Sequence, residues 1–129
     1  MKVILKRGKF KLPKTPKTNF KSGIATFICA DGLVYLASDE VLNHEAENID
    51  KLPKQETAAM AKKLFSSASC AIISKHGKVN LKDSPSAMEI LGDSFNVEII
   101  NEGLVLLIPE NGNIEGAKFF KDMILESRQ

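Results

Sequence analysis

Lysine and arginine side chains crowd the start of this chain, and their type and spacing suit the binding of phosphate groups. Eight of the first 21 residues are basic and none is acidic: Lys2, Lys6, Arg7, Lys9, Lys11, Lys14, Lys17 and Lys21. The whole chain holds 18 basic and 16 acidic residues, so residues 22–129 hold 10 basic and 16 acidic ones. The formal charge is therefore +8 before residue 22 and −6 after it.

Each Lys or Arg that contacts a nucleic-acid phosphate releases condensed counterions, which adds affinity without reading the base sequence. The sequence therefore predicts a non-enzymatic binding module that uses a basic extended arm, residues 7–21, on nucleic acid or another polyanion. The residues expected to bind are Lys6, Arg7, Lys9, Lys11, Lys14, Lys17 and Lys21.

The same arm has a second candidate partner within the protein. Five acidic residues and no basic one lie between positions 39 and 50: Asp39, Glu40, Glu45, Glu47 and Asp50. An arm lying across this acidic surface, on its own body or on a neighbouring copy, predicts an assembly or regulatory domain in a homo-oligomer. A third alternative is a small enzyme whose site lies at an oligomer interface.

Metal and catalytic motifs are incomplete. Around His44, a zinc-protease helix needs a second histidine at the position of Asn48, and a zinc deaminase needs glutamate at the position of Ala46. With two histidines and two cysteines in the chain, a three- or four-ligand site is hard to assemble. We therefore expect no metal, no cofactor and no catalytic residue, and interpret residues 39–50 as a solvated acidic loop.

The length of 129 residues fits a single domain, residues 1–129, with a core of its own. Apolar stretches such as 104–108 are too short to cross a bilayer, and the first residues lack the apolar core of a secretion signal. We expect a cytoplasmic protein without a membrane partner. In that reducing compartment Cys29 and Cys70, each inside an apolar run, should be reduced and buried.

Strand and turn signals dominate the chain. Residues 24–30 and 33–37 flank Asp31-Gly32, a dipeptide that suits the positive φ angles of a tight hairpin turn. A second hairpin is predicted for 95–100 and 104–108, a first strand for 2–6, and a shorter strand pair for 70–74 and 78–81. Pro13 and Pro16 prevent regular structure after residue 12.

Helix signals occur in three places. Pro53 suits the first turn of a helix whose apolar stripe is Ala58, Met60, Ala61, Leu64 and Phe65. Ser84-Pro85 starts a short helix that Gly92 ends. A last helix is expected from Asn113, burying Ile114, Ala117, Phe120 and Ile124. Together these elements predict an α+β fold: a mainly antiparallel sheet built from hairpins, with two longer helices and one short helix packed on it.

Two resemblances accompany this assignment. Lys75-His76-Gly77-Lys78 followed by Ser84 to Gly92 resembles a stretch of the anthranilate phosphoribosyltransferases, over about 18 of 129 residues. It departs from that family at Met88, where the family has aspartate, and lacks the glycine-rich phosphate loop, so we interpret 76–77 as a turn and 84–85 as a helix start. The order of hairpins and helices resembles that of Roadblock-like adaptor domains, which implies assembly with a partner subunit.

Overall fold

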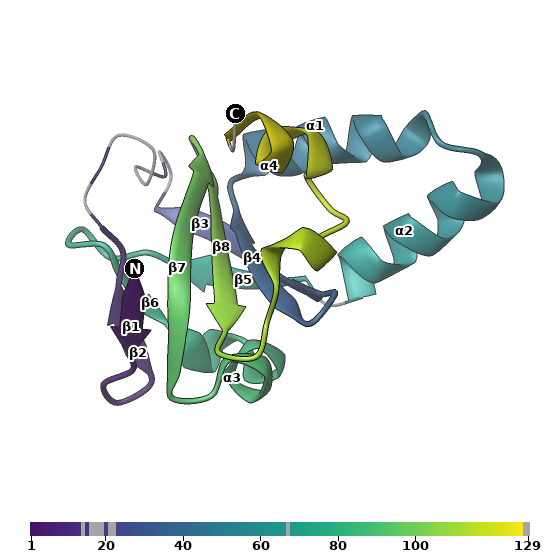
Figure 1. Cartoon of the computed structure of the whole chain (residues 1–129). Helices are drawn as coiled ribbons and strands as arrows, with labels where there is room; N and C mark the ends of the chain where they lie inside the picture. Colours follow the sequence, from purple (N-terminus) through teal and green to yellow (C-terminus); the bar gives the residue numbers. More distant parts are fainter. Residues whose placement is uncertain (14, 16–19, 21–22, 67, 128–129) are drawn as a thin grey trace.

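The structure is a computed structural model that describes the chain except residues 14, 16–19, 21–22, 67 and 128–129. The side chains of residues 63–65 are also outside the description. The predicted α+β fold is confirmed: a mainly antiparallel sheet packs against helices (Figure 1).

Six strands form the main sheet, and every pair of neighbours in it is antiparallel. Their order across the sheet is β1 (Lys2–Ile4), β7 (Ser94–Asn101), β8 (Leu104–Pro109), β4 (Leu33–Ala37), β3 (Ile24–Ala30) and β5 (Ser69–Ile72). Two further strands, β2 (Lys9–Lys11) and β6 (Lys78–Asn80), pair with each other in a small separate sheet.

The hairpin centred on Asp31-Gly32 is confirmed. Ala30 pairs with Leu33, and the two residues between them have φ angles of 60° and 72°, as a two-residue hairpin turn requires. Phe27 and Ile28 point to opposite faces of β3, and both side chains are fully buried. The main sheet is therefore covered on both faces at β3.

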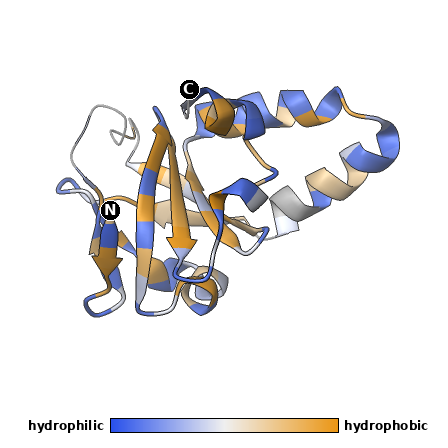
Figure 2. Ribbon diagram, viewed as in Figure 1, coloured by the Kyte–Doolittle hydropathy of each residue, from blue (hydrophilic) through white to orange (hydrophobic). Residues whose placement is uncertain are grey.

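Two hydrophobic cores lie on the two faces of this sheet. One core joins the sheet to β2, β6, the 3₁₀ turn η2 (Leu81–Asp83) and the helix α3 (Pro85–Leu91). The other joins it to α1 (Asp39–Asp50), the 3₁₀ turn η3 (Ile114–Gly116) and α4 (Lys121–Ser127). Figure 1 shows α3 on one side of the sheet and α1 with α4 on the other, and Figure 2 shows the strands between them as mostly hydrophobic.

The acidic segment 39–50 is a helix, so its interpretation as a solvated loop is wrong. Ser38 caps α1, because its Oγ accepts a hydrogen bond from the backbone N–H of Val41 at 3.3 Å. Val41, Glu45 and Ile49 form the buried face at i, i+4 and i+8. A carboxylate in the middle of that face is the reason the apolar pattern was not visible in the sequence.

The helix expected from Pro53 is present as α2 (Lys54–Ser66), and the N–H of Thr57 donates to the carbonyl oxygen of Pro53 at 2.9 Å. Of its predicted apolar stripe, the side chains of Leu64 and Phe65 lie outside the described residues. Ala58 is exposed, while Met60 packs against the core that α1 and α4 share. In Figure 1, α1 and α2 form a helical hairpin whose connection extends away from the sheet.

The last helix is shorter than predicted. Ile114, Ala117, Phe120 and Ile124 are all buried as expected, but they lie on the turn η3, an irregular link and α4 rather than on one helix. Ala117 is extended and Phe120 has a φ of 55°, neither of which a continuous helix allows. The described chain thus contains two longer helices, α1 and α2, and two short ones, α3 and α4.

The hairpin β7–β8 and the short helix α3 are confirmed. Ser84 caps α3, Pro85 occupies its first turn, and Gly92 ends it with a φ of 65°. The pair predicted for 70–74 and 78–81 is only partly correct. Its tight turn exists, with the N–H of Ser74 donating to Lys78 O at 3.0 Å, but β5 pairs with β3, and β6 pairs with β2.

Candidate anion-binding surface

In the small sheet β2–β6, apolar side chains point into the protein and lysine side chains point outward. Phe10 lies opposite Val79, and both point inward, with 4% and 0% of their surface exposed. Lys9 and Lys11 alternate with Phe10 and therefore point outward, and Lys78 lies directly opposite Lys11. Three exposed ammonium groups thus share one face above a buried apolar layer.

This arrangement places like charges side by side. Directly opposed residues of an antiparallel pair have Cβ atoms about 4.5–5.5 Å apart, so two lysines there repel each other. A salt bridge of 3.5 Å joins Lys2 Nζ on β1 to Glu110 Oε1, just after β8, and it involves neither Lys11 nor Lys78. Among the residues that the structure describes, no carboxylate forms a salt bridge with Lys11 or Lys78.

A tight turn extends the cluster beyond the small sheet. Lys6 and Lys9 exchange backbone hydrogen bonds of 3.0 and 3.1 Å around Arg7 and Gly8. The backbone N–H of Leu81 donates to Gly8 O at 2.8 Å and fixes the turn to η2. A Cβ atom on Gly8 would lie 2.9 Å from Lys82 Cε, so the stem of Lys82 lies directly against this glycine.

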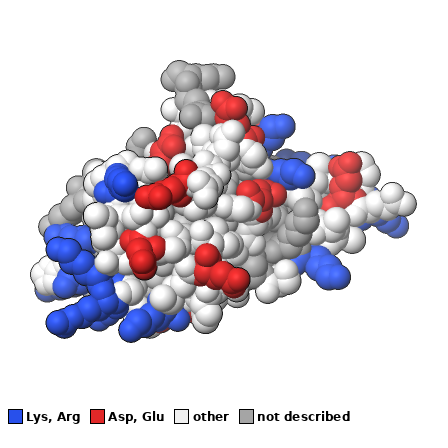
Figure 3. All heavy atoms as spheres, turned by 60° about the horizontal axis from the view of Figure 1, so that its bottom comes forward, with Lys and Arg blue, Asp and Glu red and all other residues white. Residues whose placement is uncertain are grey.

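We call the resulting surface the basic face; it consists of Lys6, Arg7, Lys9, Lys11, Lys78 and Lys82, all exposed. Figure 3 shows Lys and Arg side chains gathered at the end of the molecule where the β1–β2 turn lies, with acidic side chains spread over the rest of the visible surface. Such a grouping raises the local concentration of anions.

Four of the residues predicted to bind lie together on this face: Lys6, Arg7, Lys9 and Lys11. Lys14, Lys17 and Lys21 lie outside the described residues. Lys78 and Lys82 were missed, because they are about 70 residues away in the sequence. The alternation Lys78-Val79-Asn80 mirrors Lys9-Phe10-Lys11, and that polar–apolar–polar pattern was the available signal.

The segment that carries these lysines is part of the body. Phe10, Leu12 and Phe20 are buried in the same core as α3, with 4%, 3% and 7% exposed. The Phe10 ring meets Phe95 edge to face, with centroids 5.1 Å apart. The N–H of Leu12 donates to Gly77 O at 2.9 Å. Lys9 and Lys11 are consequently mounted on an anchored backbone.

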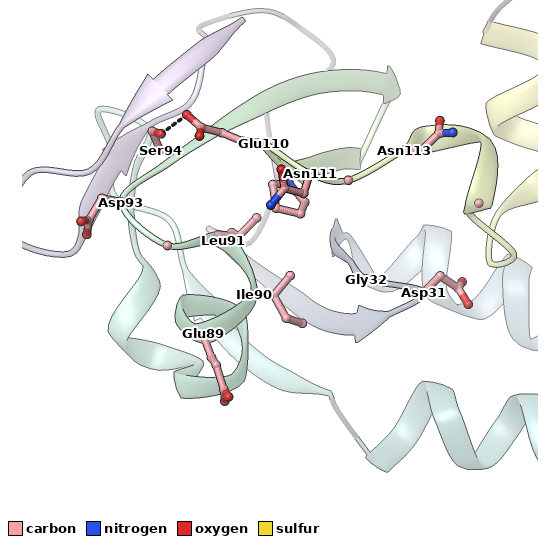
Figure 4. A pocket seen from close by; sticks show the side chains of 14 residues that line it. Asp31, Gly32, Glu89, Ile90, Leu91, Asp93, Ser94, Glu110, Asn111 and Asn113 are labelled. Atoms are coloured by element: carbon pink, nitrogen blue, oxygen red, sulfur yellow. Dashed lines mark hydrogen bonds between the residues drawn. The ribbon is translucent and has the colours of Figure 1, made fainter.

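A second surface feature carries the opposite charge. A hollow of about 560 Å³ lies between the β3–β4 turn, the end of α3 and the connection after β8, and Figure 4 shows its lining. Its charged lining residues are all acidic: Asp31, Glu89, Asp93 and Glu110. We call it the acidic hollow.

The carboxylates of the acidic hollow do not converge on a common point. In Figure 4, Glu89 and Asp93 point away from the hollow, and Glu110 faces Ser94. Ser94 Oγ donates to Glu110 Oε1 at 2.6 Å, and this bond, with help from Lys2, lowers the pKa of Glu110. Asp31 Oδ2 accepts hydrogen bonds from the Tyr35 hydroxyl at 3.4 Å and from the Lys118 N–H at 3.0 Å. The hollow therefore offers negative charge without an acid–base pair.

Two serine residues have structural roles. Ser38, which precedes Asp39, caps α1, and Ser84 in the transferase-like segment caps α3. Across the described ranges, no group of three or more His, Cys, Asp or Glu residues could hold a metal ion. No helix in the same ranges is long and apolar enough to span a membrane. The chain matches no known protein-family model and no curated protein.

Proposed function

We propose that this protein is a non-enzymatic binding module that uses the basic face to bind the phosphate backbone of nucleic acid. The observation that carries the proposal is the pairing of Lys11 with Lys78 beside Lys9, on one side of β2–β6. Like charges placed side by side in this way cost free energy when no ligand is bound. Phosphates placed across them would remove that cost and release counterions.

The anchoring of the segment supports the same function. Because Phe10 and Leu12 are fixed in the core, the neighbouring lysines lose little backbone freedom on binding, which reduces the entropic cost of association. Contacts to phosphate oxygens carry no base information, so the lysines of this face give affinity with little sequence preference.

The test compares two triple variants of equal charge change. Lys9→Gln with Lys11→Gln and Lys78→Gln neutralises the basic face. Lys54→Gln with Lys62→Gln and Lys121→Gln neutralises exposed lysines on α2 and α4. Fluorescence anisotropy with a labelled 20-base-pair DNA duplex, measured from 50 to 200 mM salt, gives the slope of log affinity against log salt. That slope should fall by about three in the first variant, because each phosphate contact contributes about one.

The control variant should keep a slope close to that of the wild type. Equal slopes in the wild type and the basic-face variant would contradict the proposal. So would the absence of any duplex binding by the wild type at 50 mM salt.

The acidic hollow favours a second candidate, an assembly domain in which the basic face of one copy docks on the hollow of another. Its charged lining residues, Asp31, Glu89, Asp93 and Glu110, supply the opposite charge. Contacts between unlike surfaces of identical chains form rings or open filaments. Light scattering at low salt should then show an oligomer that the basic-face variant dissociates; a monomer at all protein concentrations contradicts this candidate.

A further inference from the structure

Arg7 has a backbone conformation that arginine rarely adopts. Its φ is 57°, in the left-handed region where the Cβ of an L residue is crowded by the backbone. Two-residue hairpin turns of this type prefer Asn, Asp or Gly at the first position. The β3–β4 hairpin follows that preference with Asp31. Arginine at the corresponding position of the β1–β2 turn thus costs stability that a common alternative would avoid.

The turn that presents Arg7 is short and braced. Two hydrogen bonds between Lys6 and Lys9 close it, and the bond from Leu81 N–H to Gly8 O ties it to η2. Beyond the pair of Lys6 and Lys9 the strands separate, because β1 pairs with β7 and β2 pairs with β6. What projects at this end of the molecule is therefore a turn with one exposed arginine, not a long two-stranded ribbon (Figure 1).

Lysines surround the projecting arginine. Lys6 and Lys9 flank it in the turn, and Lys82 lies against Gly8 beside it. A single arginine with lysines around it matches a narrow groove with a phosphate backbone on each wall. The narrow minor groove of A-tract DNA has an enhanced negative potential that attracts arginine, whereas the minor groove of A-form RNA is wide and shallow.

We propose that Arg7 inserts into the narrow minor groove of duplex DNA while the neighbouring lysines contact phosphates on its walls. This inference rests on the proposed binding of nucleic acid and specifies the duplex and the groove. Binding to unpaired bases instead uses exposed aromatic rings. Phe10 and Phe20, the rings nearest in sequence to the basic residues, are buried.

The experiment uses three variants at Arg7, one control variant at Lys9, and three probes of equal length. The variants are Arg7→Lys, Arg7→Ala, Arg7→Asn and, as a control, Lys9→Gln. The probes are a 20-base-pair duplex with a central A-tract, a G·C duplex and an RNA duplex. The wild type should bind the A-tract duplex most tightly. Arg7→Ala should weaken that binding by roughly tenfold, and Arg7→Lys should remove the preference for the A-tract while nearly keeping the salt slope.

Arg7→Asn separates binding from folding. Because asparagine suits the left-handed position, this variant should have an equal or higher denaturation midpoint than the wild type and yet lose affinity for the A-tract duplex. Lys9→Gln should lower the salt slope by about one and keep the preference between the duplexes.

The inference is overturned if the wild type binds the three probes equally, if it binds RNA duplex most tightly, or if Arg7→Lys keeps the full A-tract preference. Those results leave the proposed function intact, provided that the triple lysine variant still lowers the salt slope. An unchanged slope in the triple variant overturns the proposed function itself.

Discussion

At the scale of single residues, the two thiols differ although both lie in apolar strands. Cys70 on the edge strand β5 is exposed, so the prediction that it is buried is wrong. Cys29 on β3 is partly buried, its Sγ lies 4.0 Å from Ser84 Oγ, and burial raises the pKa of its thiol. The sequence shows that both residues lie in apolar strands, but it does not show which strand lies at the edge of the sheet.

This difference predicts two rates of thiol labelling. A disulfide reagent should modify Cys70 quickly in the native protein. It should modify Cys29 much more slowly. Burial limits the access of the reagent, and the raised pKa lowers the fraction of reactive thiolate. Cys70→Ser should remove the fast phase, and Cys29→Ser should remove the slow one. Equal rates for both thiols would contradict the burial that the structure assigns to Cys29.

The carboxyl group of Glu45 makes the stability of the protein depend on pH. Burial raises its pKa above the ordinary 4.5, although the Phe120 N–H bond and His44 act against the shift and Asp122 adds to it. Because the folded pKa is the higher one, this group contributes stability at low pH and loses it as pH rises through the folded value.

Glu45→Gln should therefore make folding less sensitive to pH. The free energy of unfolding of this variant, relative to the wild type, should increase between pH 4 and pH 8. Glu47→Gln, at an exposed position on the same helix, serves as the control. Urea denaturation at each pH measures both differences; a constant difference for Glu45→Gln would show that its carboxyl group titrates alike in the folded and unfolded chains.

At the scale of elements, the hairpins and α3 were predictable because their signals are local. Asp31-Gly32 specifies a turn, and Ser84, Pro85 and Gly92 specify both ends of one helix. The last helix was predicted too long, because the backbone conformation of Phe120 interrupts it. The neighbouring residue types contain no signal for that interruption. The pairing of β2 with β6 joins short segments about 70 residues apart, which no local pattern reveals.

The turn of the β3–β4 hairpin gives an element-scale prediction. Gly32 has a φ of 72°, and a Cβ there would meet no atom within 4 Å, so a substitution acts through backbone strain alone. Gly32→Val should lower the free energy of unfolding by about 1–3 kcal/mol. Gly116→Val is the matched control, because its Cβ also meets open space and its φ lies outside the left-handed region. Equal chemical denaturation midpoints for the two variants would contradict this account.

At the scale of the whole molecule, the first residues both complete a core and carry the excess positive charge. The sequence predicted the charge and four of the six residues of the basic face. It did not show that Phe10, Leu12 and Phe20 pack against strands from the rest of the chain, because burial depends on long-range contacts. The acidic hollow could not be predicted from the sequence either, since its lining comes from three separate segments.

Removing one anchor should therefore affect folding far more than removing one charge. Phe10→Ala deletes a ring that is 4% exposed and packs on Phe95, and it should cost about 3–5 kcal/mol of unfolding free energy. Lys11→Gln, at the next position, should change stability little or raise it slightly because it removes a repulsion from Lys78. Similar midpoints for wild type and Phe10→Ala would mean that β2 contributes little to the fold.

Because Lys11 and Lys78 lie opposite each other, dissolved salt should have opposite effects on the stability of the protein and on its affinity for a polyanion. Counterions screen their repulsion, so added salt should raise the melting temperature of the empty protein. The same ions compete for the ammonium groups and weaken the hold on a polyanion. A bound polyanion stabilises the folded state through mass action, and this gain should shrink as salt rises. The difference in melting temperature between the protein with and without ligand should therefore shrink as the ionic strength increases.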